Sequence, residues 1–539
     1  MRRWNGWGDD GFALELPDNG TRFLEERLEV GRALPDASLE EVCEKVPESR
    51  LPEHRLVARD AETRVRHARG QSLPDWLAMR SGEFGTFPDG VALPESSDEV
   101  AELLQWAREQ DLCVIPYGGG TSVAGHINPA ESARPVLTLS LERMSRLLDL
   151  DTESQIATFG AGTPGPLVEA QLLAQDYTLG HFPQSFELST VGGWVVSRSS
   201  GQQSLRYGRI EQLFAGGRLE TLEGTWNIPT FPASAAGPDV REMILGSEGR
   251  LGVLTEVKVR VTPVPEKESF HVLFFPNWKH ARTCARALVQ NRTPLSMLRL
   301  SNAVETETQL ALAGHPKLIA GLERYLSFRG AEQGKCMMTV GLTGTSAQCR
   351  LGLKELKSIS HRHEGVYTGT YLGRKWEAKR FTMPYLREAL WKEGYAVDTL
   401  ETATDWDNVD ALMEKIESNL RHGLEPEGEA VHVFTHLSHV YSQGCSIYTT
   451  YVFRCADSYE ETYKRWERLK RTTSEIIVNN RGTISHQHGV GRDHAPYLPV
   501  EKGAHAMKAL YSLARTFDPD KRLAPGVLLD DGKETEGNG

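Results

Sequence analysis

The 539-residue sequence contains no long apolar run, no block of basic residues and no pair of closely spaced cysteines. No segment approaches the roughly 20 consecutive apolar residues that a membrane-spanning helix needs. A formal net charge of -12 gives no reason to expect nucleic-acid binding. The seven cysteines are scattered, which favours free thiols in a reducing compartment over a zinc site or a disulfide framework. We therefore expect a soluble, cytoplasmic protein.

The length of the chain indicates more than one domain, because a single hydrophobic core rarely grows this large. Helical patterns dominate residues 1–84. A β-α-β pattern follows, with a short strand at Val91–Pro94 and a helix whose capping-box signature is Ser96 with Glu99. We expect one α+β domain over residues 85–264, a second over 265–480, a segment at 481–530 that completes the second domain, and a flexible tail at 531–539.

A strand that ends in glycines is the most informative stretch. Residues 111–122 read DLCVIPYGGGTS, in which a short apolar run is followed by three glycines and two hydroxyl residues. Glycines let successive N–H groups turn inward around a phosphate, because no Cβ blocks its approach. The loop has neither the lysine of a P-loop nor the GxGxxG spacing of a Rossmann turn. Alone, it is equally consistent with a plain turn between two strands.

Two later stretches favour the phosphate-binding interpretation of this loop over the plain turn. Residues 183–200 read PQSFELSTVGGWVVSRSS, and residues 246–254 read GSEGRLGVL. The three stretches, in this order, resemble the flavin-binding domain of the vanillyl-alcohol oxidase superfamily. The resemblance implies an α+β fold, with a two-lobed PCMH-type FAD-binding domain and an α+β cap. It also implies FAD, held non-covalently because the glycine loop lacks the histidine to which some relatives tether the flavin.

The resemblance implies which residues contact the cofactor. The expected FAD-binding residues are Pro116, Tyr117, Gly118, Gly119, Gly120, Thr121, Ser122, Gln184, Ser185, Phe186, Glu187, Leu188, Ser189, Thr190, Ser197, Arg198, Ser199, Ser200, Glu248, Gly249, Arg250, Leu251, Gly252, Val253 and Leu254.

Three residues of the second domain could carry chemistry. Tyr448 follows Ile447 in a strand-like run, so if Ile447 packs in the core, Tyr448 points into the cleft. His486 and His488 lie two residues apart ahead of a glycine turn, and a neutral imidazole can relay a proton. The alternatives are a packing tyrosine and a hydrogen-bonded structural pair of histidines.

These residues resemble motifs of the alkylglycerone-phosphate synthases, ether-lipid enzymes of the same superfamily. That family has a WNGWG opening, a tyrosine in a C-I-Y strand, an H-H-H-G-V-G segment and an arginine in a Y-[IL]-R-[DE] helix. By resemblance, Tyr448, His486 and His488 are catalytic. Arg387 binds substrate, with a solvated surface arginine as its alternative, and Arg299 is a second candidate.

The resemblance implies a non-redox use of flavin, in which acyl-dihydroxyacetone phosphate exchanges its fatty acid for a fatty alcohol. Tyr448 with His486 or His488 would shuttle a proton, and an arginine would grip a carboxylate or phosphate. We expect a lipid-like substrate, a homodimer and contact with a membrane surface. The sequence departs from the family at Gln487, at Ser301 and at Pro525.

A rival interpretation is an FAD-linked oxidoreductase of a 2-hydroxy acid such as glycolate, D-lactate or D-2-hydroxyglutarate. Many such enzymes bind a divalent metal through a G-H-x-G-D-G-N-x-H segment and an E-H-G segment. This chain has His436 and His439, but Gln487 stands where the glutamate belongs, so we expect no metal. A third alternative is a binding protein that keeps FAD only structurally.

Overall fold

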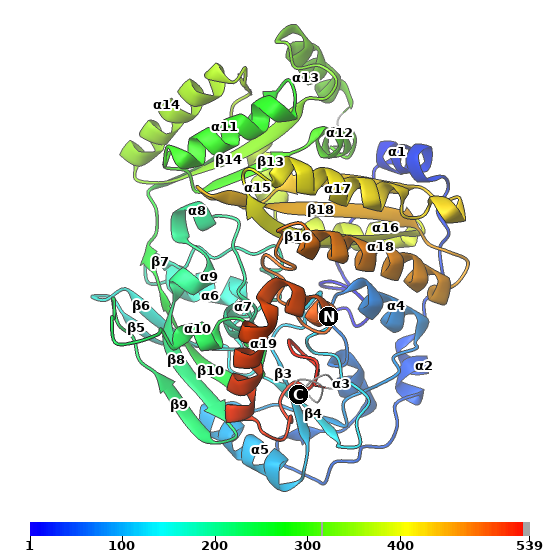
Figure 1. Ribbon diagram of the computed structural model, residues 1–539, viewed down its shortest axis with the longest axis vertical. Helices are drawn as coiled ribbons and strands as arrows, with labels where there is room; N and C mark the ends of the chain where they lie inside the picture. Colours follow the sequence, from blue (N-terminus) through cyan, green and yellow to red (C-terminus); the bar gives the residue numbers. More distant parts are fainter. Residues whose placement is uncertain (314–315, 532–539) are drawn as a thin grey trace.

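The computed structural model describes residues 1–313 and 316–531, and two halves are stacked along its long axis (Figure 1). Most of the predicted tail lies outside the described residues. The N-terminal segment wraps beside both halves. Its elements are α1 (Asp18–Leu28), α2 (Leu39–Glu44), β1 (Val57–Ala58), α3 (Ala61–Arg66) and α4 (Leu73–Ser81).

The first lobe of the lower half is a four-stranded sheet in the order β1-β2-β4-β3. Ser96 accepts a hydrogen bond from the Glu99 N–H, as the sequence predicts, but the Glu99 carboxylate bonds the N–H of Glu95, so the capping box is not reciprocal. The elements added here are β2 (Gly90–Ala92), α5 (Ser97–Glu109), β3 (Cys113–Tyr117) and β4 (Val136–Ser140).

The second lobe is a five-stranded antiparallel sheet in the order β5-β6-β10-β8-β9. A single hydrophobic core, which includes Leu139, Phe159 and Phe214, joins it to the first lobe. Its elements are β5 (Leu147–Asp151), β6 (Ile156–Gly160), α6 (Gly165–Leu173), β7 (Tyr177–Thr178), α7 (Val191–Ser197), α8 (Ser204–Tyr207), α9 (Ile210–Leu213), β8 (Phe214–Thr221), β9 (Gly224–Ile228), α10 (Arg241–Ile244), β10 (Val253–Arg260) and β11 (Thr262–Pro263).

The upper half, the cap, is built on a seven-stranded antiparallel sheet in the order β15-β12-β14-β13-β17-β18-β16. Its strands are β12 (Lys267–Phe275), β13 (Met297–Ser301), β14 (Cys336–Gly344), β15 (Val366–Tyr367), β16 (Tyr395–Asp405), β17 (Val431–Leu437) and β18 (Gly444–Arg454). Its helices are α11 (Trp278–Gln290), α12 (Ala303–Ala311), α13 (Pro316–Phe328), α14 (Ser346–Arg362), α15 (Tyr371–Lys379), α16 (Leu386–Lys392), α17 (Val409–His422) and α18 (Tyr459–Asn479).

One face of the cap sheet is apolar and the other is polar near its centre. Helices α11, α14 and α17 cover the apolar face, where Ile447 and Tyr451 of β18 are fully buried. Because successive side chains of a strand point to opposite faces, Tyr448 lies on the other face. Near Tyr448, that face meets the loop that carries His486 and His488.

The C-terminal segment joins the two halves. Helix α19 (Leu498–Phe517) is interrupted at Gly503, whose φ of 73° is left-handed, and it contacts α18 of the cap. Phe517 stacks on Trp226 of β9, and Leu523 forms a parallel bridge with Val114 of β3. The segment that the sequence predicts to complete the cap therefore also packs on the lower half.

A second connection is the N-terminal strap, residues 2–12. Arg2 donates from Nη2 to the Gly119 carbonyl oxygen in the glycine loop at 2.5 Å. Arg3 forms an ion pair with Glu388 of the cap at 3.0 Å, and Trp7 is buried. The strap thus holds the glycine loop and α16 together.

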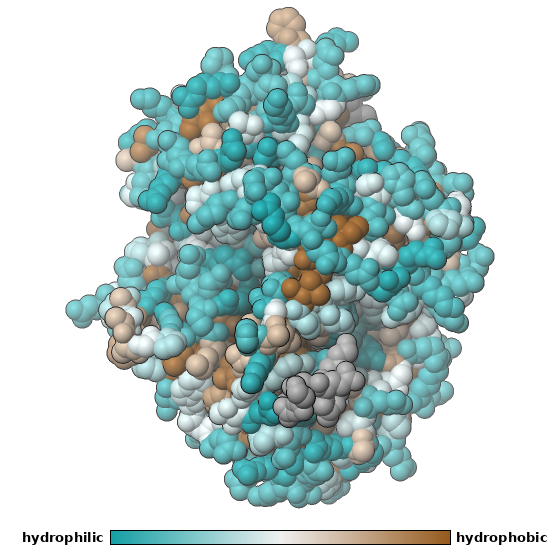
Figure 2. Space-filling model, viewed as in Figure 1, coloured by the Kyte–Doolittle hydropathy of each residue, from teal (hydrophilic) through white to brown (hydrophobic). Residues whose placement is uncertain are grey.

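The surface in Figure 2 is mostly hydrophilic, with apolar side chains only in small separate patches. Within residues 1–313 and 316–531, no helix has both the length and the apolar character required to cross a bilayer.

Candidate flavin site and catalytic cluster

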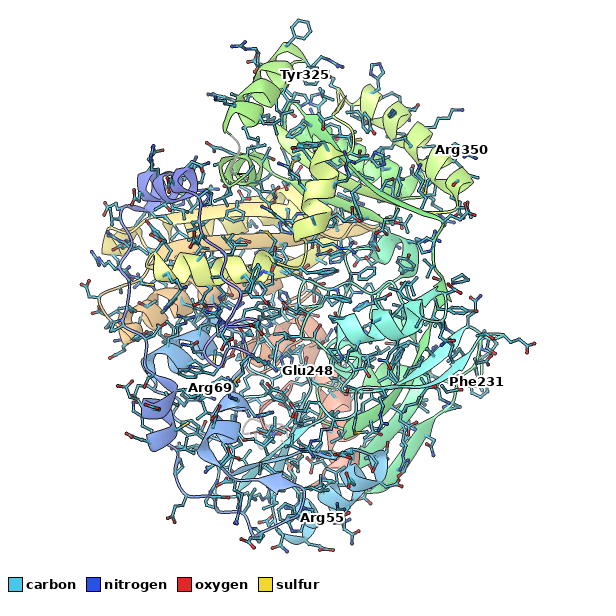
Figure 3. The ribbon with its side chains drawn as sticks, turned by 180° about the vertical axis from the view of Figure 1, so that it is seen from behind. Arg55, Arg69, Phe231, Glu248, Tyr325 and Arg350 are labelled. Atoms are coloured by element: carbon cyan, nitrogen blue, oxygen red, sulfur yellow. The ribbon has the colours of Figure 1, made fainter. Side chains whose placement is uncertain are left out.

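A pocket with about 1100 Å³ of free space, part of it open to solvent, lies where the two halves meet. Figure 3 places Glu248, one of its lining residues, near the centre of the molecule. The predicted FAD-binding residues that line it are Pro116, Tyr117, Gly118, Gly119, Gly120, Thr121, Ser122, Ser185, Ser189, Thr190, Ser197, Ser199, Glu248, Gly249, Gly252, Val253 and Leu254. The cap contributes Gln487 and His488.

Two of the predicted cofactor loops pack against each other. A Cβ built on Gly119 would overlap the carbonyl oxygen of Leu188, and one on Gly118 would overlap the Thr190 hydroxyl. Only glycine permits this approach, because any side chain would push the loops apart. The backbone of the glycine loop is therefore left facing the pocket.

The other predicted cofactor residues do not line this pocket. Glu187 accepts a hydrogen bond from Tyr385 of the cap at 2.8 Å, and the Ser200 hydroxyl lies 3.2 Å from His439 Nδ1. Gln184 is exposed, and the carbonyl oxygen of Leu188 packs against Gly119. The remaining residues support the walls: Phe186 stacks on Phe381, Arg198 pairs with Glu242, Arg250 pairs with Asp531, and Leu251 lies in the core.

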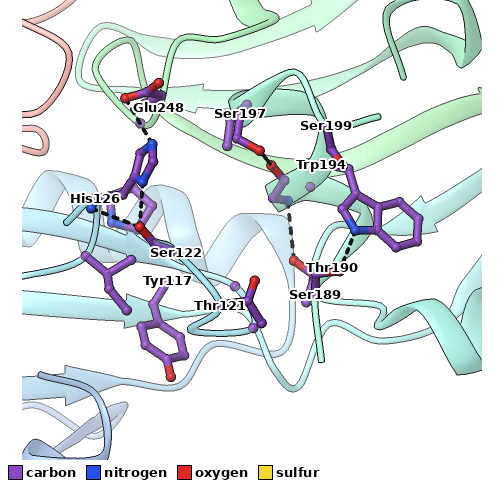
Figure 4. Close-up of a pocket in the computed structure, with 18 of the residues that line it drawn as sticks. Tyr117, Thr121, Ser122, His126, Ser189, Thr190, Trp194, Ser197, Ser199 and Glu248 are labelled. Atoms are coloured by element: carbon purple, nitrogen blue, oxygen red, sulfur yellow. Dashed lines mark hydrogen bonds and ion pairs between the residues drawn. The ribbon is translucent and has the colours of Figure 1, made fainter. Parts of the chain in front are cut away.

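His126 lines the pocket and was missed from the sequence, because no motif includes it. Its Nδ1 lies 2.6 Å from the Ser122 hydroxyl, and its Nε2 lies 3.2 Å from Glu248 Oε2 (Figure 4). Burial lowers the pKa of His126, but the Glu248 carboxylate outweighs burial and raises it. Glu248 also accepts from the N–H groups of Val490 and Gly491, so it ties the two halves together at the pocket.

The residues present fit FAD. The glycine loop offers backbone N–H groups at the pocket, and several hydroxyls line its walls. The buried Gln487 side-chain oxygen, which comes from the cap, finds no hydrogen-bond partner within the part of the chain that the structure describes. Such an orphaned polar atom is normally satisfied by a ligand or water.

Beyond the pocket, three strands of the cap bring polar side chains into one row. In the sheet register, Tyr448 of β18 lies between Glu401 of β16 and His436 of β17. The Tyr448 ring stacks on His436 with centroids 4.8 Å apart, and meets His488 edge-on at 6.0 Å. Burial raises the pKa of Tyr448 well above its ordinary value, so its phenol is protonated near neutral pH.

Glu401 lies close to both histidines that the sequence singles out, His486 and His488. Its Oε1 lies 3.1 Å from His486 Nδ1 and accepts a hydrogen bond from Ser438 at 3.0 Å. Its Oε2 lies 3.6 Å from His488 Nε2. Burial would raise the pKa of Glu401, but the hydrogen bond from His486 opposes burial most strongly, and the pKa lies far below its ordinary value. Glu401 is therefore an anion.

Arg299 and Arg387, the two predicted substrate-binding arginines, differ in the hydrogen-bond partners that they already have. Arg299 pairs with Glu305 at 2.7 Å and lies 3.2 Å from His436 Nδ1. Arg387 donates to the Gln71 carbonyl, and its guanidinium lies 4.4 Å from the centroid of the Trp76 ring. Nε and Nη2 of Arg387 are buried without a hydrogen-bond partner in the described ranges. Burial lowers the pKa of Arg387 to about 10, so it still carries its charge at neutral pH.

A possible metal group also occurs here. Ligand atoms of Glu401, His439 and His486 all lie within 4.8 Å of one another. However, His486 Nε2 lies 2.6 Å from Arg209 Nη1, and a guanidinium only donates hydrogen bonds. His486 must then carry its proton on Nδ1, the nitrogen that faces Glu401. The group does not fit a metal ion, because that nitrogen has no free lone pair and a cationic guanidinium lies next to the ring.

Comparisons with known proteins identify both domains of the chain. The FAD binding domain model matches residues 88–227, and the model for the C-terminal domain of FAD linked oxidases matches residues 264–528. The chain is 28% identical to alkyldihydroxyacetonephosphate synthase of Trypanosoma brucei brucei, over 98% of this chain and 92% of that protein. It is 30% identical to the synthase of Dictyostelium discoideum, over 88% of this chain and 79% of that protein.

A solved alkyldihydroxyacetonephosphate synthase structure superimposes with a TM-score of 0.83 at 26% identity, and the match covers 97% of this chain and 98% of that one. These findings confirm the predicted α+β fold with its two-lobed FAD-binding domain and cap, and they confirm FAD as the cofactor of an enzyme. The chain belongs to the alkyldihydroxyacetonephosphate synthase family of FAD-dependent enzymes.

Proposed function

We propose that this enzyme exchanges the acyl chain of acyl-dihydroxyacetone phosphate for a fatty alcohol and releases alkyl-dihydroxyacetone phosphate. The observation that carries the proposal is the meeting of Tyr448 and His488. His488 lines the flavin pocket, and its ring touches that of Tyr448. The names of the similar proteins support the same reaction. FAD, when bound, supplies the non-redox flavin chemistry that the exchange needs.

The exchange requires a proton carrier, and two side chains provide one. The buried phenol of Tyr448 holds its proton and can donate it. Burial lowers the pKa of His488, so its imidazole is neutral and can accept a proton at neutral pH. Together they can move a proton at the reacting carbon.

The exchange also requires a cation for the carboxylate or phosphate of the substrate. Nε and Nη2 of Arg387, which have no hydrogen-bond partner among the described residues, can grip either anion with two parallel hydrogen bonds. Arg299 has less freedom, because Glu305 and His436 already bond it. We assign the anion to Arg387 and give Arg299 the role of holding His436, on which Tyr448 stacks.

The test mixes the FAD-loaded protein with acyl-dihydroxyacetone phosphate and a labelled long-chain alcohol, and measures label in the ether product. Tyr448→Phe keeps the ring stacked on His436 but removes the proton, so we expect incorporation to fall by about 100-fold or more. Full activity in Tyr448→Phe would remove the tyrosine from the mechanism. The homodimer, the membrane contact and the cytoplasmic location stay predictions from the sequence.

A further inference from the structure

Glu401 is a buried acid that no sequence motif includes. Its side chain is fully buried on β16, at the edge of the cap sheet. Oε1 is bonded by His486 and Ser438. Oε2 has no hydrogen-bond partner among the residues that the structure describes, and His488 Nε2 lies 3.6 Å away. One oxygen is thus fixed and the other is left facing His488.

His486, which bonds Oε1 of Glu401, is itself held by Arg209 and Tyr441. Arg209 Nη1 lies 2.6 Å and Tyr441 Oη lies 2.7 Å from His486 Nε2. Because the guanidinium can only donate, Nε2 accepts, and the proton of His486 sits on Nδ1 and points at Glu401. A second proton on His486 would face the Arg209 cation directly. His486 is therefore locked in one neutral tautomer and does not shuttle protons.

We propose that Glu401 is the counter-charge of His488, and that Arg209, Tyr441 and His486 act only to position Glu401. This inference rests on the proposed exchange. During the exchange, the carbon–oxygen bond to the acyl carboxylate breaks with its electron pair on the carboxylate. The alcohol oxygen bonds to the same carbon, and its proton passes to His488. Nothing is oxidised or reduced. Glu401 Oε2 then accepts a hydrogen bond from Nε2 of the positively charged His488.

Several titratable groups lie around His488 and influence its pKa. Glu401 and Asp398 come from β16, Lys470 from α18, and His486 from the same loop. Burial and Lys470 lower the pKa of His488, and a second proton on His486 would lower it further, whereas Glu401 and Asp398 raise it. Replacing Glu401 by glutamine removes one raising charge while it keeps the size of the side chain. The ionisation of His488 should therefore move to lower pH.

The first readout does not depend on turnover. Because His488 lines the flavin pocket, its ionisation should perturb the absorbance of bound flavin. In a pH titration of the FAD-loaded protein, we expect the transition to move to lower pH in Glu401→Gln and to disappear in His488→Gln. A transition at the wild-type pH in Glu401→Gln would overturn the proposal.

The second readout is turnover with labelled alcohol. We expect kcat of Glu401→Gln to fall by about 100-fold with the FAD content unchanged, and its low-pH limb to shift in the same direction as the flavin titration. Adding Glu401→Gln to His488→Gln should cost little more, because the two residues act as a unit. Additive losses would contradict the proposal.

The matched control is Glu169→Gln. Glu169 is also buried, but Thr178 and the N–H groups of Leu179 and Gly180 bond it, and no histidine of the described residues forms a hydrogen bond or ion pair with it. In Glu169→Gln, the pH of the flavin transition should equal that of the wild-type protein. If the wild-type protein makes no labelled product although Glu401→Gln still shifts the titration, the proposed reaction fails and the role of Glu401 stands.

Discussion

Two arginines stack on the same ring, that of Trp76, and they differ in their remaining bonds. Arg80 donates to the Asn5 carbonyl, to Asp36 and to Glu388, and its guanidinium lies 4.9 Å from the ring centroid. Arg387 donates to the Gln71 carbonyl alone in the described ranges, and two of its nitrogens are unpartnered. The bonds of Arg80 are all to the protein, whereas two nitrogens of Arg387 are left for the anion that we propose it binds.

Arg387→Lys should therefore weaken substrate binding. Lysine keeps the charge but loses the planar fork, and a hydrogen bond to a charged group contributes about 1.5–3 kcal/mol. We expect the KM for acyl-dihydroxyacetone phosphate to rise by about 10- to 100-fold. Arg80→Lys is the matched control, and it should lower the thermal stability without raising the KM. An equal rise in both variants would show that Arg387 acts through packing.

Sequence patterns reveal some of these residues and not others. Strand alternation places Tyr448 opposite the buried Ile447, and the structure agrees. Glu401 could not be found this way, because its place beside Tyr448 depends on the register between β16 and β18, which are far apart in the chain. The same holds for Arg209, which reaches His486 from the other half of the molecule. Long-range pairing of this kind leaves no local signal.

At the scale of elements, the glycine loop and the loop before α7 act as one unit. Gly119→Ala would force the two loops apart, because the new Cβ would overlap the Leu188 carbonyl. We expect protein that folds but retains little FAD, measured as flavin absorbance per chain after purification. Gly321→Ala on α13 is the control, since nothing lies within 4 Å of its Cβ and alanine favours a helix. Full FAD retention in Gly119→Ala would contradict this account of the loop.

The sequence predicts the glycine loop but not its partner. Three glycines after a buried strand indicate a phosphate-sized turn, yet nothing local shows that Leu188 would close over it. Helices α11 and α18 begin directly after Asn277 and Ser458, whose side chains cap their first turns. Local capping chemistry is readable from sequence, whereas contacts between loops are not.

For the whole molecule, the contact region between the two halves contains an acid, Asp493, whose ionisation is disfavoured in the folded protein. Asp493 lies there with its Oδ2 atom buried, and desolvation together with Asp75 and Asp398 raises its pKa from 3.8 to about 6. The folded protein therefore holds a proton that the unfolded chain releases. As the pH rises from about 4 to about 6, this proton is lost and stability falls, by about 3 kcal/mol in total.

Asp493→Asn removes this charge. We expect the variant to unfold at a higher temperature than the wild-type protein at pH 8, and to show little difference at pH 4, where both side chains are neutral. Thermal unfolding of the FAD-loaded proteins at the two pH values measures the effect. A gain of equal size at pH 4 would mean that packing, and not charge, limits the joint.

We propose that the flavin site joins a fatty alcohol to dihydroxyacetone phosphate without net oxidation, and one anaerobic experiment tests this. The FAD-loaded protein is given acyl-dihydroxyacetone phosphate and labelled alcohol, and the flavin spectrum and the labelled product are followed together. A parallel sample receives D-lactate, glycolate or D-2-hydroxyglutarate. The account predicts labelled ether product from a flavin that ends oxidised, and no bleaching by the hydroxy acids. Bleaching by a hydroxy acid, with no labelled product, would contradict it.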